Sequence, residues 1–332
     1  RVGVDLFFMI SGVLITASLS RHAGVGRFLV NRCVRIYPAF LVPHLLIFAV
    51  GPVIGYAWLA GLRVDEYVLH FVSNLLMLPG VFPLPIAQIV AWSLSYELAF
   101  YLFAASAFSV LRVQSRPWKW ALLAGWAALA AVTLAYHPRG WFFVAGVVVY
   151  YLAKNANGDR LTWSWEWPVG VTALVAMGAV YDTALPVAVV LGGVAMWTFV
   201  RGRDLLASLL RLPPLLYLGT ISYSFYLWHS LVLFGTKRVF GRGGGLLPHD
   251  GLNLLAFTLA SLALSVVAAQ LSYTFVETRL TNKLFGRRKP QAAPALAGST
   301  IRAAALTLHS AVRPETAQGA DVRSTPPHRK AA

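Results

Sequence analysis

The sequence predicts an all-α, polytopic integral membrane protein built as a helical bundle. Of its 332 residues, 58% are hydrophobic and only 12% are charged, whereas soluble globular domains carry about 25% charged residues. The mean hydropathy is +0.66. Nine apolar runs alternate with short loops that hold most of the basic residues. Together these observations predict nine transmembrane helices.

Each span needs about 20 apolar residues to cross the hydrocarbon core of a bilayer. The predicted spans cover residues 4–19, 37–58, 88–111, 119–136, 139–153, 168–183, 185–200, 216–236 and 252–276. The apolar stretch 67–79 is too short for a span, and it is bounded by Asp65, Glu66 and Pro79. It is predicted to be an interfacial or re-entrant segment.

The loop charges predict how these spans are oriented. The net charge is +16, and 22 of the 28 Lys and Arg residues fall on one side of the predicted bundle, with 6 on the other. By the positive-inside rule the richer side is cytoplasmic. We therefore expect a multi-pass protein of the inner (plasma) membrane with a cytoplasmic C-terminus. Because the basic residues lie between spans, their excess does not predict a nucleic-acid partner.

The composition changes after the last span. Residues 1–280 are predicted to form one transmembrane domain, and residues 281–332 a basic, Ala/Pro-rich, disordered cytoplasmic tail. The single cysteine, Cys33, excludes an internal disulfide. The eight His residues show none of the short spacings typical of metal sites, so neither a metal nor a resident cofactor is predicted.

A cluster of arginines stands between the first two predicted spans, just before Tyr37 and Pro38. Its members are Arg21, Arg27, Arg32 and Arg35. Guanidinium groups pair bidentately with phosphate, so such a cluster at a membrane face can hold a phosphorylated cofactor or substrate. The alternative is that these arginines only set the topology.

Ionisable residues inside predicted spans are the other candidates for function, because they are costly to keep in lipid. Glu97 is the strongest, since hydroxyl and indole side chains surround it and Ser93 lies four positions before it on one helical face. Its structural alternative is a buried contact that locks two helices. His229 is a candidate general base or, alternatively, a core histidine bonded to a carbonyl group. Asp5 lies near the external mouth of the first span.

Four motifs in order resemble membrane-bound acyltransferase family 3, whose members O-acylate cell-surface and extracellular carbohydrates. They are GVDLFFMISGVLI followed by FLVNRCVRIYP, then AWSLSYELAFYL, GTISYSFYLWHSLVL and SYTFVETRL. They span about residues 3–280. The last motif departs from the family pattern, because Thr278 and Arg279 replace its usual Arg-Pro pair.

The resemblance implies a bundle of about ten spans that moves an acyl group, expected to be acetyl, from cytoplasmic acyl-CoA to a hydroxyl group of a cell-surface or exported carbohydrate. The implied partners are acyl-CoA, a carbohydrate acceptor and the lipid bilayer. The residues are assigned by role: catalytic Glu97, His229 and Ser93; acyl-CoA-binding Arg32, Arg35 and Tyr37; substrate-binding Asp5, Trp92 and Tyr226.

The family's first span carries an Arg and, further along, the His taken as its catalytic base. The sequence is expected to begin after that span, which would leave nine spans here and the catalytic His outside the chain. His229 then has a supporting role. Two alternatives stay open: a multi-span transporter or flippase of a glycan or glycolipid, and a catalytically inactive family member.

Overall fold

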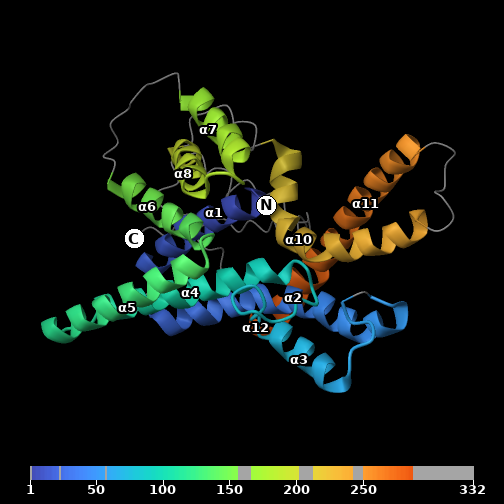
Figure 1. The fold of residues 1–332 in the computed structure, drawn as a ribbon, viewed down its shortest axis with the longest axis horizontal. Coiled ribbons are helices and arrows are strands. Elements are labelled where there is room, and N and C mark those ends of the chain that lie inside the picture. The colour runs from blue at the N-terminus through green and yellow to red at the C-terminus, as the bar shows by residue number, and fades with distance from the viewer. Residues whose placement is uncertain are drawn as a thin grey trace, which may run out of the picture.

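The computed structural model describes residues 2–21, 24–56, 58–155, 166–201, 212–241 and 250–286. Within these ranges the regular structure is helical, and a single isolated β-bridge joins Pro79 and Phe82. The prediction of an all-α fold is confirmed for the described part of the chain (Figure 1).

The helices follow the apolar runs in order. They are α1 (Val2–Arg21), α2 (Val25–Ile54), α3 (Val64–Leu75), α4 (Ala91–Leu111), α5 (Arg116–Tyr136), α6 (Gly140–Asn155), α7 (Glu166–Val180), α8 (Leu185–Arg201), α10 (Pro213–Phe240), α11 (Asp250–Ser272), the π-helix η1 (Tyr273–Leu280) and α12 (Thr281–Phe285). Helical structure dominates because backbone groups in lipid find hydrogen-bond partners only within a helix or a closed barrel.

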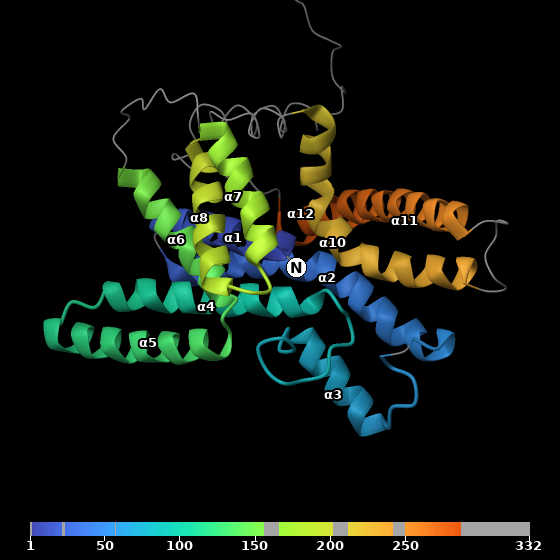
Figure 2. The same cartoon turned by 45° about the horizontal axis from the view of Figure 1, so that its top comes forward.

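Five segments of the described chain are long and apolar enough to cross a bilayer. They are Val2–Ser20, Val25–Ile54, Ala91–Leu111, Arg116–Tyr136 and Gly251–Phe285. Helices α6, α7 and α8 are apolar but contain only 15 to 17 residues each. In both views the α7–α8 hairpin also lies across the direction of the α4–α5 hairpin (Figures 1 and 2). The count of nine spans therefore remains a prediction, while a multi-pass membrane protein is well supported.

Helix α2 begins well before the predicted span 37–58. The arginine-rich segment was expected to be a loop, and the structure corrects this: the helix starts at Val25 and buries Phe28, Arg32 and Ile36 on one face. Positions four apart share a helical face, so these three side chains pack together against the bundle. At 30 residues α2 is about 45 Å long, which exceeds the roughly 30 Å hydrocarbon core.

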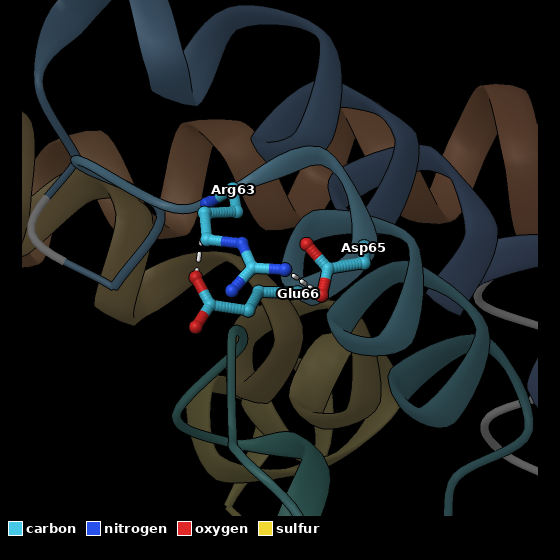
Figure 3. Close-up of polar contacts among 3 residues, drawn as sticks. All are labelled: Arg63, Asp65 and Glu66. Atoms are coloured by element: carbon cyan, nitrogen blue, oxygen red, sulfur yellow. Dashed lines mark hydrogen bonds and ion pairs between the residues drawn. The ribbon is translucent and has the colours of Figure 1, made fainter.

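The stretch predicted to be interfacial or re-entrant forms the 12-residue helix α3 and part of the loop that follows it. The start of α3 is fixed by the backbone N–H of Arg63, which donates to the Glu66 carboxylate over 2.9 Å, and by a surface ion pair of 2.9 Å between Arg63 and Asp65 (Figure 3). At about 18 Å the helix is too short to span, as predicted.

The core between α1 and α6 depends on two glycines. A Cβ atom on Gly12 would lie 2.4 Å from the Phe143 carbonyl oxygen, and one on Gly146 would lie 2.1 Å from the Met9 carbonyl oxygen. The two backbones therefore approach more closely than any larger residue permits. Close packing through small residues is a main source of helix association in lipid.

A second core cluster joins α1, α2, α4 and α10. Its buried members include Ile15, Phe40, Leu94, Tyr101 and Leu227. This cluster surrounds the polar residues described below, so it fixes the four helices that carry them.

The chain stays helical past the last predicted span. Helix α11 continues through η1 into α12, which covers the first five residues of the predicted tail. The rest of that tail, residues 287–332, lies outside the described residues.

Gly146→Val should destabilise the protein, because the new side chain would push α6 away from α1. Overpacking of this kind costs about 1–3 kcal/mol. Gly125→Val is the matched control, since a Cβ on this glycine of α5 meets nothing within 4 Å. Thermal unfolding in detergent, followed by size-exclusion chromatography, measures the difference. Equal stability of the two variants would show that the close approach is not important.

Candidate functional site

Glu97 is the centre of a buried group of polar contacts. Its side chain is only 6% exposed. The hydroxyl of Tyr101, one turn further along α4, donates to its Oε1 atom, and Ser11 Oγ of α1 lies 3.5 Å from the same atom. A carboxylate inside a bilayer is stable only where such donors or opposite charges surround it.

Two arginines of α2 supply the opposite charge. The positive charges of Arg35 and Arg32 both act on Glu97. Arg32 is 8% exposed, and its guanidinium carbon lies 5.3 Å from the ring centre of Phe28 and 5.8 Å from that of Tyr101. Arg35 is exposed. The two arginines thus differ in exposure, since both charges act on the buried carboxylate, Arg32 from a buried position and Arg35 from an exposed one.

The charge of Arg35 also acts on a second carboxylate, that of Glu277. Glu277 belongs to the π-helix η1, accepts a hydrogen bond from Ser224 of α10, and interacts with the charge of Arg35. Ser224 Oγ also lies 3.0 Å from Ser272 Oγ. π-Helical segments are rare and occur frequently at functional sites. The π-helix η1 therefore indicates that the segment carrying Glu277 does more than end the preceding helix.

Tyr226 of α10 links this helix to the start of α4. Its hydroxyl lies 2.6 Å from Ser93 Oγ and donates to the Val90 carbonyl oxygen over 3.0 Å. One turn earlier, the hydroxyl of Tyr223 donates to the Ile36 carbonyl oxygen over 2.9 Å. These bonds hold α10 against both α2 and α4.

The three predicted catalytic residues do not form one contact. Ser93 is paired with Tyr226, and it is Ser11 that approaches Glu97. His229 directs Nδ1 at the Tyr226 carbonyl oxygen over 2.7 Å, and its ring stacks on Phe225 at 6.0 Å. This carbonyl bond is the structural alternative considered for His229. Tyr226 contacts both Ser93 and His229, while the hydrogen bonds of Glu97 run to Ser11 and Tyr101.

A separate polar group forms where α1 begins. Asp5 is fully buried and accepts a hydrogen bond from Tyr181, which lies between α7 and α8. The guanidinium carbon of Arg139 lies 5.0 Å from the Trp92 ring centre and 6.0 Å from that of Tyr181, and its charge acts on Asp5. Asp5 and Trp92 are therefore both neighbours of Arg139. Tyr226, the third substrate-binding candidate, lies with Ser93 and His229 instead.

The remaining predicted residues have simpler surroundings. Tyr37 is partly buried and makes an edge contact with Phe40 at 6.3 Å. His44 is fully buried among the rings of Phe40, Phe48 and Phe71. Within the described ranges, no three His, Cys, Asp or Glu side chains lie together as metal ligands would.

Sequence reasoning missed three residues of these sites. Ser11 is a small polar residue in an apolar run, and Tyr181 lies in a short connection; neither carries a signal by itself. Arg139 was counted only as a loop charge. Its position directly before α6, among several aromatic residues, was the one available sign.

One family model and several known proteins match most of this chain. Residues 1–274 match the family model described as "Acyltransferase domain", acyltransferase family 3. The chain is 27% identical to "Acyltransferase MdmB" of Streptomyces mycarofaciens, over 88% of this chain and 83% of the relative. It is 30% identical to "Exopolysaccharide production protein ExoZ" of Rhizobium meliloti (strain 1021), over 70% and 76%.

A third relative is "Putative membrane-bound transacylase BcsY" of Komagataeibacter xylinus, 28% identical over 92% of this chain and 82% of the relative. No solved structure matches the chain significantly. The family match covers most of the residues that the structure describes, including Glu97, both α2 arginines and the Asp5 group. The chain therefore belongs to acyltransferase family 3 and is a multi-pass membrane enzyme that transfers acyl groups.

Proposed function

We propose that this enzyme transfers a short acyl group, such as acetyl, from acyl-CoA to a hydroxyl group of a cell-surface or exported carbohydrate. The observation that carries the proposal is the buried carboxylate of Glu97, held by Tyr101 and Ser11 beside a buried and an exposed arginine. An ion pair with a purely structural role would need only the buried arginine. A site for an anionic substrate also needs a positive charge that the substrate can reach.

Arg35 is the residue best suited to bind the donor. Its exposed guanidinium group offers several N–H donors, and such groups pair strongly with phosphate. The phosphates of CoA supply that anion. Arg32 is already engaged with Glu97 and the rings of Phe28 and Tyr101, so its proposed role is to position Glu97 and to keep the local charge positive. Tyr37 follows Arg35 on α2 and would border the entry.

The acceptor is inferred from the relatives and from the Asp5 group. ExoZ is named for exopolysaccharide production, which supports a carbohydrate acceptor here. The Asp5 group combines aromatic faces with hydrogen-bonding groups, and its members are Asp5, Trp92, Arg139 and Tyr181. Such a combination suits a sugar ring, which carries hydroxyl groups. This group lies near the start of α4, and Glu97 is little more than one turn further along the same helix.

The proposed reaction forms one ester bond and breaks one thioester bond. The acceptor oxygen attacks the thioester carbonyl carbon, the C–S bond breaks, and the hydroxyl proton passes through a general base to the CoA sulfur. Glu97 would stabilise the positive charge that develops on that base, as a buried carboxylate does beside a catalytic imidazole. Ser93, Tyr226 and His229 would position α10 against the start of α4.

Incubation of membrane vesicles containing the full-length protein with radiolabelled acetyl-CoA tests the proposal. Release of CoA that depends on an added cell-envelope glycan fraction, with alkali-labile label on carbohydrate, is the expected result. Glycan movement without consumption of any short-chain acyl-CoA would instead identify a transporter.

Glu97→Gln should lower kcat by about 100-fold or more, because it removes the charge while keeping the shape and the hydrogen bonds to Tyr101 and Ser11. Expression and thermal stability should change little. Ser106→Ala is the control, since Ser106 is an exposed residue of the same helix. A Glu97→Gln enzyme with normal turnover would assign this carboxylate to packing alone.

Arg35→Ala should raise KM for acyl-CoA about tenfold or more, with a smaller effect on kcat, because one charge-assisted contact to phosphate is lost. Arg63→Ala serves as the matched control, since it removes an exposed arginine that pairs with Asp65 in front of α3 (Figure 3). Unchanged KM in the Arg35 variant would remove the proposed CoA site.

A further inference from the structure

An apolar cavity of about 300 Å³ lies between α1, α4, α5 and α6. Along α4 it is lined on one face from Tyr96 to Leu111, a length of about 22 Å at 1.5 Å per residue. Small side chains leave the room: Ala99 and Ala107 on α4, and Ala130 on α5. The cavity is therefore long and narrow, which is the shape of an extended aliphatic chain.

The Ser and Thr hydroxyl groups along this cavity donate to carbonyl groups of their own helices. Thr16 donates to the Gly12 carbonyl oxygen over 2.7 Å, Ser20 to that of Thr16 over 2.9 Å, and Thr133 to that of Leu129 over 2.8 Å. A ligand in this part of the cavity would meet little that could form a hydrogen bond. The lining favours a hydrocarbon chain over a polar substrate.

One end of the cavity is polar. There the Tyr96 hydroxyl lies 3.1 Å from Nδ1 of His137, and both residues line the cavity. The ring of Tyr96 makes an edge contact with that of Trp92 at 5.9 Å, and the Arg139 guanidinium lies over the rings of Trp92 and Tyr181. Tyr96 therefore links the polar end of the cavity to the proposed acceptor site by its ring contact with Trp92.

The Asp5 carboxylate indicates what kind of head group fits there. Its Oδ1 atom is buried and has no hydrogen-bond partner, while Oδ2 accepts from Tyr181. A carboxylate is only an acceptor, and an unpaired one is costly to bury. Sugar hydroxyls can donate to it. A phospholipid phosphodiester has no hydrogen to donate to it.

We propose that the cavity holds the aliphatic chain of a lipid-linked carbohydrate and presents its sugar to the Asp5 group. This inference rests on the proposed function, because it names the acceptor class of that same site. The donor chain is a poorer fit, because neither Glu97 nor the two α2 arginines line the cavity, so CoA would lie against the adjoining face of α4.

Photolabelling can test the occupant without the acyl-transfer reaction. The probe is dodecyl maltoside with a diazirine at the end of its alkyl chain, added to the full-length protein in phosphatidylcholine nanodiscs. Label should map by mass spectrometry to α4, α5 and α6. Unlabelled dodecyl maltoside should compete at least about tenfold better than dodecanol, because the sugar head adds hydrogen bonds.

Ala130→Phe should lower labelling about tenfold by filling the cavity. Ala128→Phe is the matched control, because it adds the same side chain to an exposed position of α5 outside the cavity. Ala107→Leu narrows the cavity from its α4 wall, and it is the variant to measure if Ala130→Phe does not fold. Asp5→Asn should reduce the preference for the glycoside over dodecanol.

Equal competition by dodecanol, or equal labelling of Ala130→Phe, Ala107→Leu and Ala128→Phe, would overturn the inference and identify the cavity as ordinary lipid space. These outcomes are separate from those of the proposed function. An enzyme that releases CoA on a soluble glycan but fails the labelling test keeps its activity and loses only the lipid-linked acceptor.

Discussion

The buried charge of Glu97 is the constraint on which the arrangement of α1, α2 and α4 depends. A carboxylate at this depth must be paired, and its partners come from different places: Ser11 of α1, Tyr101 of α4 and two arginines of α2. Because α2 begins at Val25, Arg32 is part of the helix and lies on its buried face with Phe28 and Ile36.

The other carboxylates follow the same rule. Glu277 accepts a hydrogen bond from Ser224, and Asp5 accepts one from Tyr181. Each donor lies outside the helix that carries the carboxylate. Lipid tails are as apolar as leucine, so apolar surface alone does not hold helices together in a bilayer. Hydroxyl-to-carboxylate bonds and the close approach of Gly12 and Gly146 supply the specificity that a hydrophobic core supplies in soluble proteins.

Helix α4 separates two chemical environments. One face carries Glu97 toward the α2 arginines, and the adjoining face lines the apolar cavity that ends at Tyr96 and His137. Trp92, at the start of the same helix, contacts the Asp5 group through Arg139. In an acyltransferase, this arrangement would let an anionic donor and a lipid-linked acceptor approach one carboxylate from different sides.

The sequence by itself determined the all-helical membrane class, the order of the apolar helices and the position of Glu97 within one of them, because these depend on local composition and on the cost of charge in lipid. The structure brings Asp5, Arg139 and Tyr181 together. Only the tertiary structure decided that Arg32 is buried, that Ser11 rather than Ser93 meets Glu97, and that His229 bonds a carbonyl group. Those outcomes depend on which helices are neighbours and how each is rotated, and residues 86 positions apart along the chain carry no sign of their contact.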